Sequence, residues 1–440
     1  MGTQLREIPH LHRATSVIQR VKRRFSSADL QFITGSTVLT IGIAIARVLG
    51  FGFSMILTRK LTQEDYGFVQ YCITLAGIVA IITQPFAQHV LARFVSQYKG
   101  DREQLASFLN TAALLILALT GLTLLVAVPV LIAIGRFNVG VLTVFVGITI
   151  FYIYYGAARG FIASSRLLAA YLGSNLVQII AIFLLYVVFD EQSPMPALLV
   201  YGLSYFVPLV VLQVLYPLPI RLKLSLPSRA SVVSLVRFST PIWLSHIAYM
   251  LHAALDVLLL EAFWGHATVG AYALTKTLTT LFNFIAMGIT TLLMPRVAEV
   301  PKEQHRALLV NALALALVVN GVVLLVFMLT YRWFVGTFFG LNYVLDTTVV
   351  LMMALAEITF VVHGVITAVI IGGDNPRLET ISRGIALGGA LVLGLALVPT
   401  YGMAGAALGN LLSAIISVGI YGGAALIRQK RPTPFAEQRL

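Results

Sequence analysis

Residues 106–134 read ASFLNTAALLILALTGLTLLVAVPVLIAI, without a single charged side chain. A helix rises about 1.5 Å per residue, so roughly 20 apolar residues cross the 30 Å hydrocarbon core of a bilayer. The run is long enough to span, and it is far too long and too uniformly apolar for a β-barrel strand of about ten alternating residues. It therefore predicts a transmembrane helix.

The rest of the chain repeats this pattern. Hydrophobic residues make up 59% of its 440 residues and charged residues 11%, against about 25% charged in an average soluble domain. We predict an all-α integral membrane protein with about twelve transmembrane helices. The expected spans are 32–58, 66–92, 106–134, 139–159, 167–189, 196–220, 238–260, 268–295, 307–331, 347–373, 380–399 and 402–427.

Lysine and arginine fall almost entirely on one side of this topology. With these spans, 24 of the 30 basic residues lie in the N-terminal arm, the even-numbered loops and the C-terminal tail, and four lie in the opposite loops. Short cytoplasmic loops are enriched in basic residues. We therefore expect a multi-pass plasma-membrane protein whose basic arm (1–31) and tail (428–440) are both cytoplasmic.

A basic connection at residues 221–237 divides the chain into two halves of six helices, residues 32–220 and 238–427. A shift of 203 residues aligns Gly67 with Gly270 and Arg93 with Arg296, at matching helix ends in the two halves. Because six is even, both halves enter the membrane in the same direction. Parallel repeats of this kind are typical of transporters built as two lobes around a central cavity.

Composition and motifs exclude several classes of function. The net charge of +13 lies in short loops between apolar runs, which argues against a nucleic-acid-binding surface. The single cysteine, Cys72, leaves no internal disulfide, and we find no catalytic, metal-binding or nucleotide-binding motif. We expect no cofactor, so active transport would use a proton or sodium gradient or the membrane potential.

Four charged residues fall well inside the predicted spans: Arg47, Asp256, Lys276 and Glu357. Each costs insertion energy, so each is a candidate for function. We expect Arg47 and Lys276 to attract an anionic group of the substrate, and Asp256 or Glu357 to couple an ion. The other expected cavity residues are Tyr249, His252 and Asn283. The alternative is that Asp256 and Lys276 neutralise each other as an internal ion pair.

Three prolines interrupt predicted spans: Pro85 in the second, Pro208 in the sixth and Pro241 in the seventh. A proline inside a membrane helix frees a backbone carbonyl and permits a bend. Each is a candidate hinge, and a static kink is the equally open alternative.

Several segments in order and spacing resemble the polysaccharide flippases of the multidrug/oligosaccharidyl-lipid/polysaccharide exporter superfamily. They are 57-LTRKLTQEDYGFVQY-71, 237-RFSTPIWLSHIAYMLHAALDVLLL-260, 269-VGAYALTKTL-278 and 395-LALVPTYGMAGAALGNLLSAI-415. The resemblance implies a cleft that opens alternately to each side of the membrane. It also implies a polyprenyl-pyrophosphate-linked oligosaccharide as substrate, moved from the inner to the outer leaflet, with Arg47 placed to hold the pyrophosphate.

Two other functions stay open at this stage. A multidrug exporter of the same fold would prefer cationic or apolar substrates and couple through Asp256 or Glu357. A membrane polysaccharide polymerase or ligase is less favoured, because the external loops are too short to build an active site. The expected partners are a lipid-linked anionic saccharide, membrane lipids, and the polymerase and glycosyltransferases of surface polysaccharide synthesis.

Overall fold

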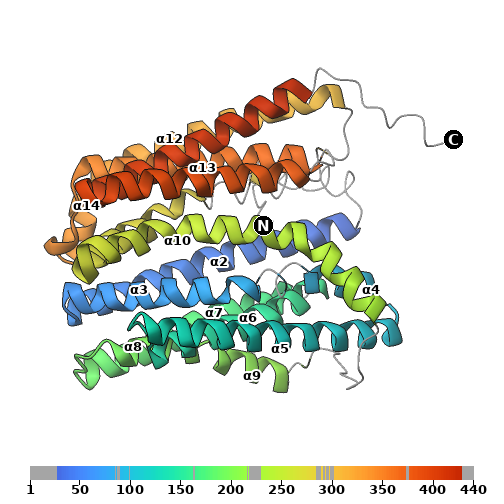
Figure 1. The fold of residues 1–440 in the computed structure, drawn as a ribbon, viewed down its shortest axis with the longest axis horizontal. Helices are drawn as coiled ribbons and strands as arrows, with labels where there is room; N and C mark the ends of the chain where they lie inside the picture. Colours follow the sequence, from blue (N-terminus) through green and yellow to red (C-terminus); the bar gives the residue numbers. More distant parts are fainter. Residues whose placement is uncertain are drawn as a thin grey trace, which may run out of the picture.

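The computed structural model describes residues 27–84, 86, 90–98, 100–161, 164–215, 217, 229–283, 289–290, 293, 297, 302–372 and 376–428. These residues are almost entirely helical, and none of them lies in a β-strand (Figure 1). Nine stretches are long and apolar enough to cross a bilayer. Two of the nine each contain a chain reversal, and α2 adds one more pass, so the described helices make twelve passes. The all-α, twelve-helix prediction is confirmed.

The N-terminal lobe contains the first six passes. Its elements are α2 (Ser27–Lys60), α3 (Gln63–Val79), the 3-10 turn η1 (Ala80–Ile82), α4 (Leu91–Tyr98), α5 (Arg102–Ala133), α6 (Val139–Gly160), α7 (Ser164–Phe183), the π turn η3 (Leu184–Val188), α8 (Met195–Leu203) and α9 (Phe206–Leu215). The second pass consists of α3, η1 and α4 in succession, and the sixth consists of α8 and α9.

The C-terminal lobe contains the other six passes. Its elements are α10 (Arg229–Thr279), α12 (Lys302–Phe338), the 3-10 turn η4 (Leu341–Tyr343), α13 (Thr347–Gly372) and α14 (Pro376–Arg428). Helix α10 begins inside the predicted linker 221–237, of which residues 221–228 lie outside the described residues. The predicted span that begins at residue 238 therefore underestimates the length of this helix, which starts earlier, at Arg229, and includes Arg237.

Two glycines reverse the chain within α10 and α14. Gly265 has φ 79° and Gly402 has φ 54°, in the left-handed region that an L side chain rarely adopts. Each therefore joins two antiparallel membrane helices through a very short turn. Both reversals lie at the same end of the bundle (Figure 1), here called the hairpin end. The opposite end, where α5, α10 and α12 begin at Arg102, Arg229 and Lys302, is called the basic end.

Short polar side chains set the starts of several helices. The Oγ1 atom of Thr62 accepts a hydrogen bond from the backbone N–H of Asp65 at the start of α3, and Asp101 caps α5 in the same way. Asn138 caps α6 and Asp346 caps α13. A side-chain oxygen here satisfies a backbone N–H that the helix itself leaves unpaired. Polar residues between the apolar runs therefore fix where these four membrane helices begin.

At the hairpin end, α3 and the second half of α10 cross at very close range. A Cβ atom added to Gly67 would lie 1.7 Å from the carbonyl oxygen of His266, and one added to Gly270 would lie 2.5 Å from the carbonyl oxygen of Gln63. The shift of 203 residues that pairs Gly67 with Gly270 also pairs Gln63 with His266. Such a reciprocal contact is typical of a two-fold axis, so the faint sequence repeat corresponds to a real pseudo-symmetry at the lobe interface.

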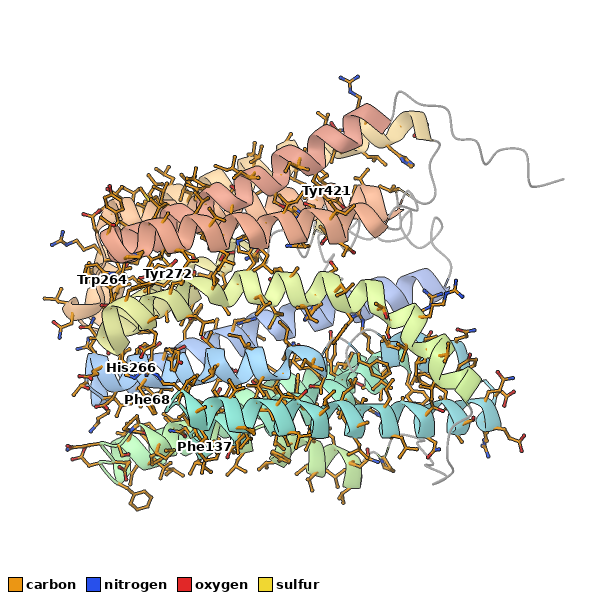
Figure 2. All side chains as sticks on the ribbon, viewed as in Figure 1. Phe68, Phe137, Trp264, His266, Tyr272 and Tyr421 are labelled. Atoms are coloured by element: carbon orange, nitrogen blue, oxygen red, sulfur yellow. The ribbon has the colours of Figure 1, made fainter. Side chains whose placement is uncertain are left out.

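An ionic cluster joins the lobes beside this crossing. Nη1 of Arg136, in the α5–α6 turn, lies 2.8 Å from Oε1 of the buried Glu261 in α10, and Oε2 of Glu261 lies 2.6 Å from Nδ1 of His266. The His266 ring also packs edge-on against Phe68 of α3, with 5.3 Å between centroids (Figure 2). The hairpin ends of the two lobes are therefore in direct contact.

Helices α5 and α12 are the third pass of each lobe, and both lie at the periphery (Figure 1). Their large apolar side chains, such as Leu125 and Leu329, are mostly exposed. An exposed apolar surface of this kind marks a contact with a membrane or with another protein, and on membrane-spanning helices it fits hydrocarbon. The matching positions of α5 and α12 are a second sign of the repeat.

Candidate functional site

A cavity of about 540 Å³ lies inside the N-terminal lobe. Helices α2, α3, α6, α7 and α8 and the α8–α9 break supply almost all of its wall, and Thr277 of α10 is its contribution from the other lobe. Its polar lining consists of Arg47, Ser54, Gln70, Tyr152, Tyr155, Tyr171, Ser174, Asn175, Gln178, Tyr201, Ser204, Tyr205 and Thr277. A volume of this size is ordinary for a small-ligand site, and the polar groups set it apart from the apolar core.

A second cavity of about 270 Å³ shares wall residues with the first, including Ile73, Tyr152 and Tyr201. It extends toward α10, where Met250, Ala253 and Ala254 line it. The two cavities together reach from the interior of the N-terminal lobe to its interface with the C-terminal lobe.

Arg47 lines the larger cavity from α2. Its side chain is exposed and makes no hydrogen bond or ion pair with any described residue. Among the described residues that line either cavity, Arg47 is the one charged side chain. A guanidinium offers planar donors that bind two oxygens of a phosphate at once, so the cavity presents an unneutralised anion-binding group.

Close packing of α2 against α7 positions Arg47. A Cβ atom on Gly42 would lie 1.6 Å from Leu168, and one on Gly52 would lie 2.5 Å from Ile179. Between these contacts, Gly50 faces Asn175. The two helices run in the same direction, so Arg47 lies at about the level of Tyr171.

Lys276 has entirely different surroundings. Its Nζ atom donates to Oδ1 and Oδ2 of Asp256 at 2.6 and 2.7 Å and to the carbonyl oxygen of Ala253 at 2.6 Å. Oδ2 of Asp256 also accepts a hydrogen bond from the Tyr272 hydroxyl at 3.0 Å. The structure thus brings Asp256 and Lys276 together as the ion pair that the sequence left as an alternative. Lys276 does not line either cavity, and its role toward a substrate stays a prediction.

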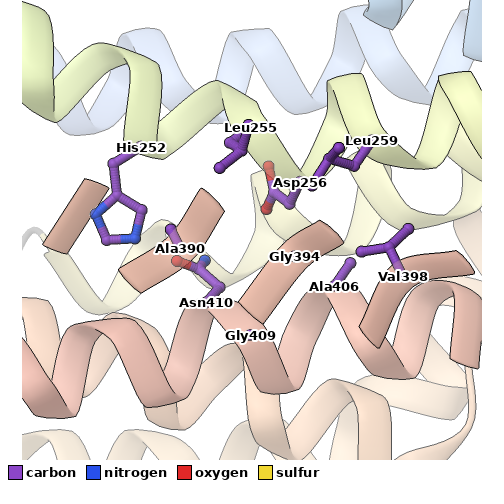
Figure 3. A pocket seen from close by; sticks show the side chains of 10 residues that line it. All are labelled: His252, Leu255, Asp256, Leu259, Ala390, Gly394, Val398, Ala406, Gly409 and Asn410. Carbon is purple, nitrogen blue, oxygen red and sulfur yellow. The ribbon is translucent and has the colours of Figure 1, made fainter. Parts of the chain in front are cut away.

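His252 lies between α10 and α14 (Figure 3), in a pocket that shares no lining residue with the large cavity. Its Nε2 atom is 2.9 Å from Oγ of Ser413. The pocket that it lines with Asp256 and Asn410 has a volume of only about 10 Å³, which holds one water molecule at most. The structure therefore places His252 and Asp256 in a tight packing site between two helices.

Tyr249, Asn283 and Glu357 are each engaged within the C-terminal lobe. The Tyr249 ring lies under the guanidinium of Arg383, 4.8 Å from its centroid, and Nε of Arg383 donates to Oε1 of Glu379 at 2.8 Å. The Asn283 side-chain amide donates to the buried Glu357 carboxylate. The buried carboxylates described in this lobe thus have polar partners, and ion coupling through Asp256 or Glu357 stays a prediction.

The three prolines have different outcomes. Pro208 follows the Ser204–Tyr205 turn that separates α8 from α9, so the predicted span 196–220 is broken in its middle. Pro241 lies within the helical part of α10 before the Gly265 reversal, in a helix that bends near its start (Figure 1), and Pro85 lies outside the described residues. Whether any of them moves as a hinge remains a prediction.

Sequence reasoning missed the tyrosines of the large cavity. Five of them line it, from three passes: Tyr152, Tyr155, Tyr171, Tyr201 and Tyr205. A usable signal was present, because Tyr152 and Tyr155 are three residues apart in α6 and Tyr201 and Tyr205 four apart in the sixth pass. Such pairs lie on one helix face. Tyrosine is usual at the membrane–water interface, so tyrosines well inside apolar runs indicate a polar interior site.

Comparison with known proteins places this geometry in a family. The family model described as polysaccharide biosynthesis protein matches residues 32–300, well over half of the chain. No curated protein matches. Among solved structures, lipid II flippase MurJ in an inward closed conformation is 15% identical with a TM-score of 0.69, covering 89% of this chain and 87% of MurJ.

Multidrug resistance transporters of the MATE family share the fold as well. An inward-facing one, described as a member of the MOP superfamily, is 14% identical with a TM-score of 0.68. The match covers 90% of this chain and 100% of the transporter chain. An outward-facing conformation of such a transporter has a TM-score of 0.58 at 15% identity, with 90% and 95% covered. The chain therefore has a fold that a lipid II flippase and MATE-family transporters share. Together with the family match, it shows that this chain belongs to the polysaccharide biosynthesis protein family and has the fold of the MOP-superfamily transporters.

Proposed function

We propose that the protein translocates a polyprenyl-pyrophosphate-linked oligosaccharide from the inner to the outer leaflet of the plasma membrane. The observation that carries this proposal is Arg47, a guanidinium that has no hydrogen-bond or ion-pair partner among the described residues and lines a cavity of about 540 Å³ inside the membrane domain. A charge in this setting costs about 3 kcal/mol of insertion energy or more. A substrate with a pyrophosphate group would complete the missing ion pair each time it binds.

Orientation follows from the basic end of the bundle, which we propose to be cytoplasmic. The positive-inside rule supports this assignment and places both termini in the cytoplasm. The hairpin end then faces outward, and the contacts of Gly67, Gly270 and Arg136 close the lobes on that side. The higher TM-scores of the inward conformations, 0.69 and 0.68 against 0.58, agree with a state that is closed toward the outside.

The proposed cycle contains no covalent chemistry. The head group enters the cavity while the lipid tail stays in the bilayer, and a rocking motion of the lobes then exposes the head group to the outer leaflet. A proton or sodium gradient or the membrane potential would drive the cycle. The enzymes that supply and consume such a substrate are glycosyltransferases on the inner side and a polysaccharide polymerase on the outer side.

The charge of the cavity separates this proposal from a multidrug exporter. A cationic drug needs an available carboxylate. Asp256 already holds Lys276 and Glu379 holds Arg383, whereas Glu357 is buried against the Asn283 amide and lines neither cavity. Arg47 would repel a cation in the large cavity.

The test uses the full chain in vesicles that contain a fluorescent polyprenyl-pyrophosphate sugar. Arg47→Gln is expected to lower the translocation rate about 10- to 100-fold, the loss that corresponds to removing a charged hydrogen bond worth roughly 1.5–3 kcal/mol. Arg47→Lys keeps the charge without the planar donors and is expected to lie between Arg47→Gln and wild type.

Arg332→Gln is the control, because Arg332 is an exposed arginine of α12 that does not line the cavities. The control should translocate lipid at the wild-type rate. Unchanged transport by Arg47→Gln would overturn the proposal, as would vesicles that expel a lipophilic cation but do not move the lipid.

A further inference from the structure

The five tyrosines of the large cavity form one continuous surface, here called the tyrosine wall: Tyr152, Tyr155, Tyr171, Tyr201 and Tyr205. Helix α6 supplies the first two, α7 the third, and the two sides of the α8–α9 break the last two. Tyr155 is 9% exposed, and the other four are half-buried. The wall thus belongs to the cavity and does not form a belt at the membrane surface.

One buried ring organises the wall. Phe151 is only 2% exposed, and its centroid lies 5.1 Å from Tyr171, 5.1 Å from Tyr205 and 5.6 Å from Tyr152. The Phe151 contacts with Tyr152 and Tyr171 are edge-on and that with Tyr205 is tilted. Edge-on contacts also join Tyr155 to Tyr171 at 5.7 Å and Tyr201 to Tyr205 at 5.7 Å. Edge-to-face packing at these distances is favourable and fixes ring orientation. The wall is therefore built in advance of any ligand.

The chemistry of the wall differs from that of Arg47. A tyrosine offers an apolar ring face together with a hydroxyl that donates and accepts hydrogen bonds. Two side-chain amides, Asn175 and Gln178, line the same cavity, and Gln84 lines the adjoining one. A lipid tail cannot form hydrogen bonds with the hydroxyls and amides, and a phosphate does not pack on the faces of the rings. A sugar ring uses both, because its C–H face packs on an aromatic ring while its hydroxyls point outward to polar groups.

We propose that the tyrosine wall is a saccharide subsite, which binds a sugar ring of the same head group whose pyrophosphate pairs with Arg47. This inference rests on the proposed function and deepens it. Arg47 lies at about the level of Tyr171, which matches a ligand whose phosphate and first sugars are adjacent. The cavity then recognises two chemical parts of one substrate with two separate groups of residues.

The experiment measures binding of two probes to the purified full chain: a polyprenyl pyrophosphate that carries N-acetylglucosamine, and the same polyprenyl pyrophosphate without sugar. Tyr152→Leu and Tyr201→Leu remove the ring faces at positions that line both cavities. Each is expected to weaken binding of the glycosylated lipid about tenfold, the effect of losing an aromatic contact and its hydroxyl, and to leave the sugar-free lipid unchanged. Arg47→Gln is expected to weaken both.

Tyr154→Leu is the matched control, since Tyr154 lies on the same helix α6 but packs in an apolar cluster outside both cavities. It should bind both lipids like wild type.

Tyr152→Phe keeps the ring face without the hydroxyl. If this variant retains its affinity for the glycosylated lipid, the effect of Tyr152→Leu is assigned to stacking. Thermal melting of every variant checks that it is folded.

The saccharide subsite is overturned if the tyrosine variants weaken both lipids equally or weaken neither, while Arg47→Gln still weakens both. The proposed function fails instead if wild type binds neither lipid, or if Arg47→Gln leaves both affinities unchanged. The two failures are therefore distinguishable.

Discussion

Arg47 and Lys276 carry the same charge inside the membrane domain, but their surroundings differ completely. The Lys276 ammonium has three oxygen acceptors within 2.7 Å, two of them from the Asp256 carboxylate. Arg47 has no such partner among the described residues and faces a cavity. Because an unpaired charge in this location is costly, we interpret Lys276 as a structural cation and Arg47 as a group that is kept for its ligand.

This difference predicts the behaviour of the ion pair. Lys276→Met leaves the Asp256 carboxylate, only 6% exposed, without its cation. Breaking a buried pair in this way costs about 3–5 kcal/mol, whereas replacing both partners together is far less costly. We expect the single variant to melt at a clearly lower temperature in detergent and the double variant Lys276→Met/Asp256→Asn to recover most of the loss.

Lys60→Met is the matched control, because it breaks the exposed pair between Lys60 and Asp190 at the hairpin end. Exposed pairs contribute little, so its melting temperature should stay close to that of wild type. A Lys276→Met protein as stable as wild type would contradict the structural interpretation.

At the residue scale the sequence predicted the charged groups better than the aromatic ones. Arg47, Asp256, Lys276 and Glu357 could be found because a charge in an apolar run is costly wherever it points. Their pairing depends on where the chain reverses. With the reversal at Gly265, Asp256 and Lys276 face each other across a hairpin. The tyrosine wall could not be foreseen, because its members come together only when three passes converge.

At the scale of elements, the crossing of α3 and α10 depends on having glycine at both contact positions. A Cβ atom at Gly67 would lie 1.7 Å from a backbone oxygen, whereas ordinary contacts begin near 3.4 Å. The neighbour is backbone, so it cannot rotate away as a side chain can. The lobes approach this closely at the hairpin end only because neither glycine has a side chain.

We therefore predict that Gly67→Ala separates the two helices at the hairpin end. Spin labels at Glu64→Cys and Ala267→Cys, in a Cys72→Ala background, would report the separation, since Glu64 and Ala267 are exposed on the two crossing helices. The mean distance between the labels is expected to increase, with slower lipid translocation if closure of this end is part of the cycle.

Gly77→Ala is the control on the same helix, because a Cβ atom at Gly77 meets nothing within 4 Å. Its label distance should equal that of the glycine protein. An unchanged distance in Gly67→Ala would show that the crossing is not what holds the hairpin ends together.

The membrane passes could be predicted from apolar run length, but their interruptions could not. Pro208 marked a candidate bend in the span 196–220, and the chain breaks there between α8 and α9. Pro241, also inside a predicted span, does not break the helix, although α10 bends near its start (Figure 1). The difference depends on neighbours that the sequence does not identify. One of them is Gly173: a Cβ atom added to it would lie 2.7 Å from Cβ of Pro208, so the absence of a side chain leaves room for the proline ring.

At the scale of the whole molecule, the two lobes are joined at the hairpin end by several independent contacts. Besides the glycine crossing, Arg136 binds Glu261, and Nε of Arg59 donates to the carbonyl oxygen of Phe338 at 3.1 Å. The Tyr66 ring packs edge-on against Tyr343, with 5.6 Å between centroids. These contacts must break together when this end opens, so each of them stabilises the closed state relative to the open one.

The Arg136–Glu261 pair provides a test of that closure. Arg136→Gln leaves Glu261, whose side chain is 5% exposed, with His266 as its remaining partner in the cluster. We expect this variant to increase the fraction of molecules with a long Glu64–Ala267 label distance. Adding Glu261→Gln should return most of them to the short distance, because the uncompensated carboxylate is then removed.

Arg332→Gln serves again as the control, since it removes an exposed arginine without touching the cluster. If Arg136→Gln leaves the distribution of distances unchanged, the pair is a passive contact and closure depends on helix packing alone.

The ion pairs of the C-terminal lobe also have an electrical consequence. Asp256 with Lys276, and Glu379 with Arg383, are dipoles of zero net charge, so these two pairs contribute almost no gating charge when the lobe tilts. One elementary charge that crosses the full field gains about 2.3 kcal/mol per 100 mV, and the paired residues avoid this work. Of the four charged residues inside the predicted spans, Arg47 and Glu357 are the two that no described ion pair neutralises, so sensitivity to voltage is left to Arg47 with its anion and to the Glu357 carboxylate.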